Sequence, residues 1–176
     1  MSNLRVMSNP YAQSGPQSST SAVGRPVASV GKRIGGRLLD TIILSIAVGL
    51  LLVGWLARRI SDVASGDKIP TGTLILAQAV GLAIGFLYEV PMVAKTGQTL
   101  GKKLAGTRVV RLSDGQVPGW NTAVLRWIPA LVGLLPGAIG SAAGLVVGVG
   151  SLILLFTDPL RQTVYDKVAK TIVIDA

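Results

Sequence analysis

The stretch Val30-Gly-Lys-Arg-Ile-Gly-Gly-Arg-Leu-Leu-Asp40 opens the first long apolar run of the chain. No charged residue occurs from position 41 to position 57, and about 20 apolar residues are enough for an α-helix to cross the hydrocarbon core of a bilayer. Arg33 and Asp40 are seven positions apart, so a helix presents them on one face, two turns from each other. Charges at a membrane boundary are costly unless they meet a partner or water. We therefore expect a first membrane helix over residues 34–57 with a charged beginning.

The composition favours an integral membrane protein over a soluble one. The 176 residues are 49% hydrophobic and only 14% charged, whereas about a quarter of the residues of a typical soluble domain are charged. Cysteine and histidine are both absent, which removes thiolates, the commonest metal ligand and the commonest general base. We expect no enzyme activity, no cofactor and no metal site.

Two further apolar regions follow. Residues 71–88 form an uncharged run of membrane-spanning length, and residues 127–157 form a longer one that Pro136-Gly137 interrupts. The longer run fits a pair of short helices, roughly 122–135 and 138–156, hinged at that dipeptide, because broken helices are tolerated where protein or water surrounds the break. Residues 1–30 are rich in Ser, Gly, Pro, Asn and Gln, which predicts a disordered N-terminal tail ahead of a membrane domain over 31–176.

A weak internal echo favours this four-segment topology. Lys103-Leu-Ala-Gly-Thr-Arg-Val-Val110 resembles Lys167-Val-Ala-Lys-Thr-Ile-Val-Ile174, and both end in strand-like residues. Two such strands can pair only if an even number of crossings separates them. We predict an all-α integral membrane protein with four membrane segments and a small cytoplasmic β element.

The basic residues predict the orientation and the surroundings. The net charge is +9, and most Lys and Arg residues lie in the N-terminal segment, the central polar stretch and the tail. Cytoplasmic loops carry such an excess, so we expect a multi-pass protein of the plasma membrane with both termini cytoplasmic. The cations would face anionic headgroups rather than nucleic acid.

Four ordered motifs resemble the RDD family of small prokaryotic membrane proteins. They are Arg33-Ile-Gly-Gly-Arg-Leu-Leu-Asp40, a glycine-rich stretch over 96–110, Leu125-Arg126, and Arg161-Gln-Thr-Val-Tyr-Asp-Lys-Val-Ala-Lys-Thr171. The resemblance implies that Arg33, Asp40 and Asp166 are the residues that give the family its name. Its motifs also supply supporting candidates: Arg37, Arg126, Arg161, Gly97, Gly101 and Lys102. Tyr165 and Lys170 depart from the family, which commonly has His and Gly there. The family's biochemical role is unsettled, and some members have been linked to transport, including sodium–proton exchange.

Three hypotheses follow from these residues. In the first, Arg33 or Arg37 pairs with Asp40 or Asp166 at the cytoplasmic boundary and locks the first helix to the tail. In the second, Asp40, Glu89 and Asp166 are stations for a proton or small cation in a transporter. In the third, the protein is a partner or lipid module whose basic central stretch and tail dock anionic headgroups, a soluble or membrane-protein partner, or a second copy of the chain.

Overall fold

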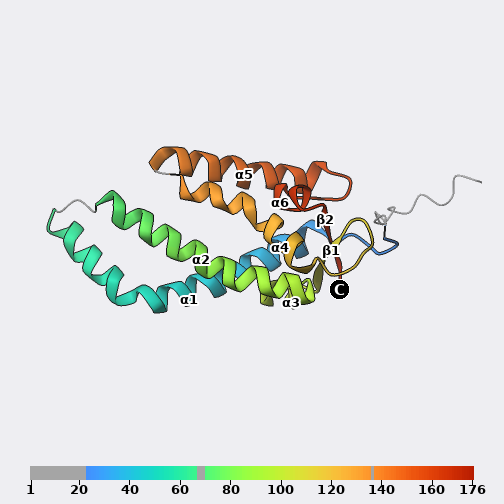
Figure 1. The fold of residues 1–176 in the computed structure, drawn as a ribbon, viewed down its shortest axis with the longest axis horizontal. Coiled ribbons are helices and arrows are strands. Elements are labelled where there is room, and N and C mark those ends of the chain that lie inside the picture. Colours follow the sequence, from blue (N-terminus) through green and yellow to red (C-terminus); the bar gives the residue numbers. More distant parts are fainter. Residues whose placement is uncertain (1–22, 67–69, 136) are drawn as a thin grey trace, which may run out of the picture.

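The computed structural model describes residues 23–66, 70–135 and 137–176. Its elements in chain order are α1 (Val30–Ala64), α2 (Thr71–Thr96), α3 (Leu100–Leu104), β1 (Thr107–Arg111), α4 (Gly119–Trp127), the 3-10 helix η1 (Ile128–Leu134), α5 (Gly137–Thr157), α6 (Val164–Val168) and β2 (Thr171–Asp175). Figure 1 shows an elongated molecule in which α1 and α2 run antiparallel along one side and α4–η1 and α5 run antiparallel along the other. The short helices and both strands gather at one end, together with the C-terminus.

Two helices, α2 and α5, are long and apolar enough to cross a membrane. The helix α1 is a third candidate if its halves, Val30–Leu50 and Leu52–Ala64, count as one span, because they meet at an angle of 65°. Gly49 and Gly54 flank this bend, and glycine weakens a helix locally. The described part of the chain therefore has two or three candidate spans, where the sequence predicts four segments.

The predicted third helix over 122–135 is shorter and irregular in the structure. A regular α-helix covers only Gly119–Trp127, and the tighter η1 begins at Ile128 with Pro129 in its first turn. Proline removes a backbone donor and its ring clashes with the preceding turn, which explains the change. After η1, Leu135 is extended and Gly137 has a φ of +60°, so the chain reverses next to the predicted hinge.

The helix α2 also ends later in the structure than the sequence predicts. The apolar run ends at Tyr88, but α2 continues through Pro91 to Thr96 and is capped by Gly97 in the left-handed conformation. This extension carries Glu89 and the buried residues Val90 and Val93 into the polar end of the molecule.

The two strands pair antiparallel, with Val109 opposite Val173 at the centre of the register. Their side chains form the core together with Ala28, Val90 and Val93, among others. Most of the predicted N-terminal tail, residues 1–22, lies outside the described residues. The end of the segment assigned to that tail packs on the sheet, since Val27 bridges Ile174 and the Ala28 amide donates to the Val173 carbonyl at 3.1 Å.

The internal echo corresponds to two copies of one structural unit. In each copy a threonine caps a five-residue helix, at Thr99 for α3 and at Thr163 for α6, and a strand follows. The Gln98 side chain donates to the Thr107 carbonyl at 2.9 Å, and Gln162 donates to the Thr171 carbonyl at 2.7 Å. Because equivalent residues are 64 positions apart, as Val109 and Val173 are, the paired strands relate the two units by a local two-fold axis.

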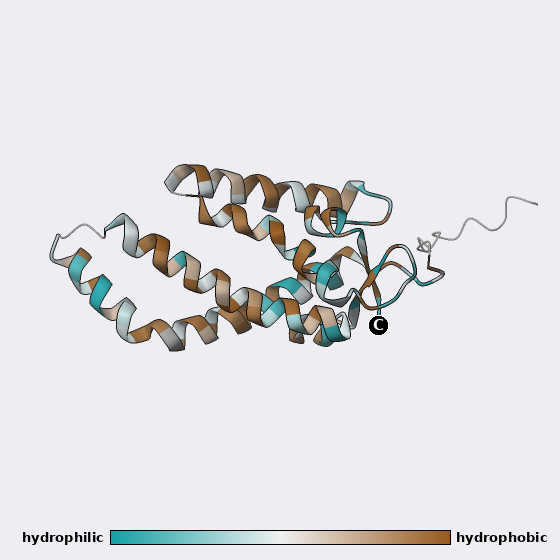
Figure 2. Ribbon diagram, in the orientation of Figure 1, coloured by the Kyte–Doolittle hydropathy of each residue, from teal (hydrophilic) through white to brown (hydrophobic). Residues whose placement is uncertain are grey.

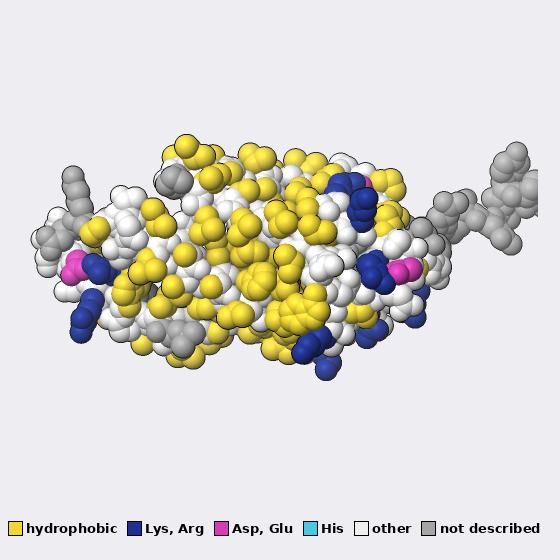
Figure 3. Space-filling view, viewed as in Figure 1, with side chains coloured by type: hydrophobic (Ala, Val, Ile, Leu, Met, Phe, Trp, Pro, Cys, Tyr) yellow, Lys and Arg dark blue, Asp and Glu magenta, His cyan; other side chains and the backbone are white. Residues whose placement is uncertain are grey.

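Exposed apolar side chains are frequent on the long helices. Figure 2 shows the long helices coloured mostly as hydrophobic, with hydrophilic residues at the two ends. In Figure 3 hydrophobic side chains cover the centre of the visible face, and Lys and Arg lie toward its two ends. A soluble monomer rarely exposes so continuous an apolar surface, so this belt fits the hydrocarbon core of a bilayer.

Candidate functional site

Charged side chains from five helices meet inside the polar end of the molecule. We call them the charge network, and its members are Arg33, Arg37, Asp40, Glu89, Lys102, Arg126 and Asp166. Three of the cations, Arg33, Lys102 and Arg126, have side chains less than a tenth exposed. They balance the three carboxylates, and Arg37, whose side chain is 54% exposed, is the additional cation.

Asp40 lies in α1 and receives donors from two other helices. Its carboxylate accepts the Tyr88 hydroxyl at 2.7 Å, the Thr99 hydroxyl at 2.5 Å and the Gly101 amide at 2.8 Å. The ammonium of Lys102 lies 3.4 Å away. Asp40 is only 3% exposed, so these donors replace the water that an ionised carboxylate needs.

Glu89, near the end of α2, is surrounded by three cations. One carboxylate oxygen accepts from Arg126 at 2.9 Å and lies 3.6 Å from the Lys102 ammonium. The other accepts from Arg37 at 3.1 Å. Glu89 therefore joins α1, α3 and α4 electrostatically.

Asp166, in α6, is fully buried. Two nitrogens of Arg126 donate to one of its oxygens at 2.9 and 3.1 Å, and Arg33 lies 3.4 Å from the other. The Thr163 hydroxyl and amide also donate to the second oxygen, completing a capping box. Burial alone would raise the pKa of Asp166, but Arg126 and Arg33 outweigh burial and hold that pKa below its ordinary value of 3.8.

Arg33 binds the C-terminal unit mainly through backbone oxygens. It donates to the carbonyls of Leu160, Arg161 and Val173, the last at 2.7 Å. Arg161 therefore contributes its carbonyl, while its own guanidinium donates to the Ala28 carbonyl at 3.4 Å. The helical face shared by Arg33 and Asp40 does not lead to a pair between them, since Arg33 meets Asp166 and Asp40 meets Lys102.

Lys102 is enclosed although it belongs to a basic stretch. Burial lowers the pKa of its ammonium below the ordinary value of 10.5, against the opposing effects of Glu89 and Asp40. Its neighbour Lys103 is exposed, so only one of these two adjacent lysines faces solvent.

Two glycines allow the backbone to approach the site closely. Gly97 has a φ of +71°, and a Cβ atom there would lie 2.4 Å from the Val109 carbonyl oxygen. A Cβ on Gly101 would lie 2.4 Å from the Gly36 oxygen and 2.7 Å from an Asp40 carboxylate oxygen. Only glycine lets α3 lie against α1 with the Gly101 amide bonded to Asp40.

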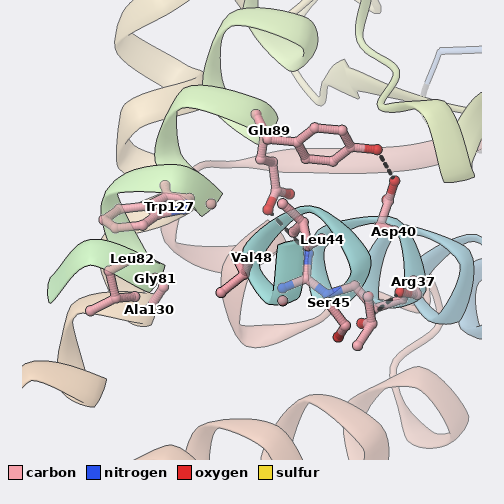
Figure 4. Close-up of a pocket in the computed structure, with 14 residues that line it drawn as sticks. Arg37, Asp40, Leu44, Ser45, Val48, Gly81, Leu82, Glu89, Trp127 and Ala130 are labelled. Atoms are coloured by element: carbon pink, nitrogen blue, oxygen red, sulfur yellow. Dashed lines mark hydrogen bonds and ion pairs between the residues drawn. The ribbon is translucent and has the colours of Figure 1, made fainter. Parts of the chain in front are cut away.

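Two cavities lie on different sides of the charge network. The first, of about 520 Å³, is the Glu89 cavity; it is lined by Asp40, Glu89 and Arg37 and by apolar residues of α1, α2, α4 and η1. Figure 4 shows Asp40, Arg37 and Glu89 around it, with Val48, Leu82 and Trp127 along its apolar part. Its lining contains two carboxylates and one cation.

The second, of about 310 Å³, is the Arg33 cavity, and its charge is opposite. Four cations and one carboxylate line it: Arg33, Arg37, Lys102, Arg126 and Asp166. The remaining lining comes largely from apolar residues of α1 and α5. The network thus presents its carboxylates Asp40 and Glu89 to one cavity and most of its cations to the other.

The structure brings together all of the charged site candidates from the sequence except Arg161, which contributes its backbone oxygen. Sequence reasoning missed the hydroxyl donors Tyr88, Thr99 and Thr163. The pattern Thr163-x-x-Asp166 is a readable capping-box signal, but nothing local marks Tyr88. Within the described ranges, no three acidic side chains are grouped as metal ligands.

The fold and the site define a helical membrane protein with a charge network between its helices. The sequence model of the RDD family matches residues 27–170, and the chain belongs to this family. No curated protein and no solved structure matches the chain.

Proposed function

We propose that the protein is an accessory module of the plasma membrane and that its charge network is a structural lock. The supporting observation is that donors and cations of the chain itself already bind the three carboxylates of the charge network. Asp40 and Asp166 each accept from at least three groups, and Glu89 lies between three cations. A carboxylate that must bind and release a travelling ion needs free coordination, whereas a lock needs every oxygen occupied.

The proposal includes four membrane segments, with α1 and the α4–η1 pair entering the membrane beside α2 and α5. Both termini and the two-stranded sheet then lie at the cytoplasmic face, near anionic headgroups. An accessory role also requires a membrane-protein partner or a second copy of the chain. Lys103, rather than the buried Lys102, is the suitable position for a photocrosslinker that captures such a partner.

Replacing Asp40 with Asn tests the lock. The amide accepts at one oxygen only and leaves the Lys102 ammonium without a close charged partner on that side. We expect a lower yield of folded protein and a loss of about 3–5 kcal/mol in stability, typical of a broken buried pair. Thermal unfolding in detergent measures the loss, and it should not depend on the cation in the buffer.

Asp62→Asn is the matched control on the same helix. Asp62 pairs with Arg59 at 2.9 Å on the surface, where both side chains are about one-third exposed or more. Exposed pairs contribute little, so this variant should unfold like the wild type. Equal melting temperatures for Asp40→Asn and Asp62→Asn would contradict the lock.

Transport of a proton or small cation is the second candidate. The Glu89 cavity favours it, because Asp40 and Glu89 give the lining a net negative charge. Proteoliposomes loaded with a pH-sensitive dye separate the proposals. The lock alone predicts no pH change when a sodium or potassium gradient is imposed, and a gradient-driven change that Glu89→Gln abolishes would establish transport.

A further inference from the structure

We propose that the Arg33 cavity binds the headgroup phosphate of an anionic phospholipid. Three independent features point to this ligand: the charges of the lining, a buried donor without an acceptor, and the apolar flank of the cavity. Five members of the charge network line this cavity, but the lock requires only contacts within the chain, so lipid binding and the lock can be tested independently.

The lining is strongly cationic. Of its five charged residues four are basic, and the one acidic group, Asp166, already has donors on both oxygens. The carboxylates of Asp40 and Glu89 line the other cavity. A phosphate in the Arg33 cavity would therefore meet guanidinium and ammonium groups in a poorly hydrated site, where charge attraction is strong.

Arg33 carries a buried donor that lacks a partner. Its side chain is 5% exposed, and among the described residues no acceptor lies within hydrogen-bond distance of its Nε. Buried donors are nearly always satisfied. The protein encloses this nitrogen, so an anionic oxygen bound in the cavity would supply the missing acceptor after a small shift of the Arg33 side chain.

The apolar flank distinguishes a lipid from a free anion. The lining includes Leu38 and Leu152, which are 58% and 48% exposed. A volume of about 310 Å³ holds a phosphate and its glycerol but not the acyl chains, which would lie over these leucines outside the cavity. The cavity is also near the beginning of α1 and the end of α5, the depth at which the phosphates of a bilayer lie.

A pair of glycines in α5 provides the test. Gly148 lines the cavity and Gly144 does not, while a Cβ atom on either would meet nothing within 4 Å. The Cβ atom of Gly148→Leu therefore adds bulk at the wall of the cavity and meets no other atom within 4 Å, and Gly144→Leu, which lies outside the lining, is the matched control. Each protein is extracted from vesicles of equal phosphatidylglycerol and phosphatidylcholine, and native mass spectrometry counts the retained lipid.

We expect the wild type and Gly144→Leu to retain phosphatidylglycerol over phosphatidylcholine, and Gly148→Leu to lose this retention about tenfold or more. Equal retention of the two lipids by the wild type would overturn the proposal, whatever the variants do. Unchanged retention by Gly148→Leu would also overturn it.

A second measurement separates a lipid from a free anion. Bound ligand raises the melting temperature of the folded state, so a short-chain phosphatidylglycerol should stabilise the wild type and inorganic phosphate should not. Equal stabilisation by inorganic phosphate would overturn the lipid assignment. Because every member of the charge network is intact in Gly148→Leu, its melting temperature without lipid should match that of Gly144→Leu; failure of the lock would appear instead in Asp40→Asn.

Discussion

Arg126 joins the two halves of the charge network. Its guanidinium donates two nitrogens to Asp166 and a third to Glu89. Arginine suits this position because its planar fork can satisfy two carboxylates at fixed angles, which a lysine ammonium cannot reproduce. The sequence suggests Arg126 only as a supporting residue, since Glu89 and Asp166 are 37 and 40 positions away in the chain.

Acidification should weaken the network at Asp166, which lies outside the candidate spans. Because the folded state lowers the pKa of this carboxyl, its ionised form stabilises the fold above its ordinary value of 3.8, and the contribution disappears as the pH falls through the lower, folded value. The difference in melting temperature between the wild type and Asp166→Asn should be large near neutral pH and shrink below about pH 4. A difference that stays constant down to the most acidic pH would contradict this cause.

The identity of the site residues is more predictable than their pairing. The seven-residue spacing of Arg33 and Asp40 correctly indicates one helical face, but each residue pairs with a different partner. The choice depends on where α3 and α6 lie, and those positions come from tertiary contacts such as the Gly101 approach. No sequence pattern within α1 contains that information.

At the scale of elements, α3 depends on a glycine. Replacing Gly101 with Ala would put a Cβ atom 2.4 Å from the Gly36 oxygen and 2.6 Å from the Asp40 amide nitrogen, so α3 would have to move away from α1. We expect Gly101→Ala to lower the melting temperature clearly. Gly35→Ala in α1 is the control, because a Cβ there meets nothing within 4 Å and alanine favours a helix by up to about 1 kcal/mol. Similar melting of the two variants would refute the close contact.

The duplicated helix–strand unit shows that Lys170 has a backbone conformation that favours glycine. Lys170 follows α6 with a φ of +51°, and its equivalent after α3 is Gly106, with a φ of +63°. The left-handed conformation costs a side-chain-bearing residue roughly 1–2 kcal/mol. Lys170→Gly should therefore raise the melting temperature, and Lys170→Ala, which keeps the Cβ atom, should not. An increase for both variants would point to the lysine charge instead of the backbone.

The helices are largely predictable from the sequence, and their breaks less so. Uncharged runs identify α2 and α5, because helices in lipid are uniformly apolar. The bend in α1 lies between two glycines, and the 3-10 geometry of η1 follows from a proline in its first turn. The length of an apolar run does not predict either feature. The echo between residues 103–110 and 167–174 does predict partners, because the two segments pair in the sheet.

At the scale of the molecule, the short helices and the two strands lie at one end, and the end of α1 and the beginning of α2 lie at the other (Figure 1). The absence of cysteine allows this arrangement to be tested without background labelling. Single cysteines at Ser65 and Leu135 should react with a membrane-impermeant maleimide added to intact cells. Cysteines at Ser113 and Ala176 should react only after lysis. Labelling of Ser65 and Ser113 variants from the same side would contradict the proposed topology.

The contact between Arg33 and Asp166 spans 133 positions of the chain. During synthesis, the first of these residues reaches the membrane long before the second leaves the ribosome. Until then Arg33 lacks its carboxylate partner, and Arg126 has only Glu89. Synthesis of α6 therefore completes the charge network, and we expect a chain that ends before α6 to be less stable than one that contains it.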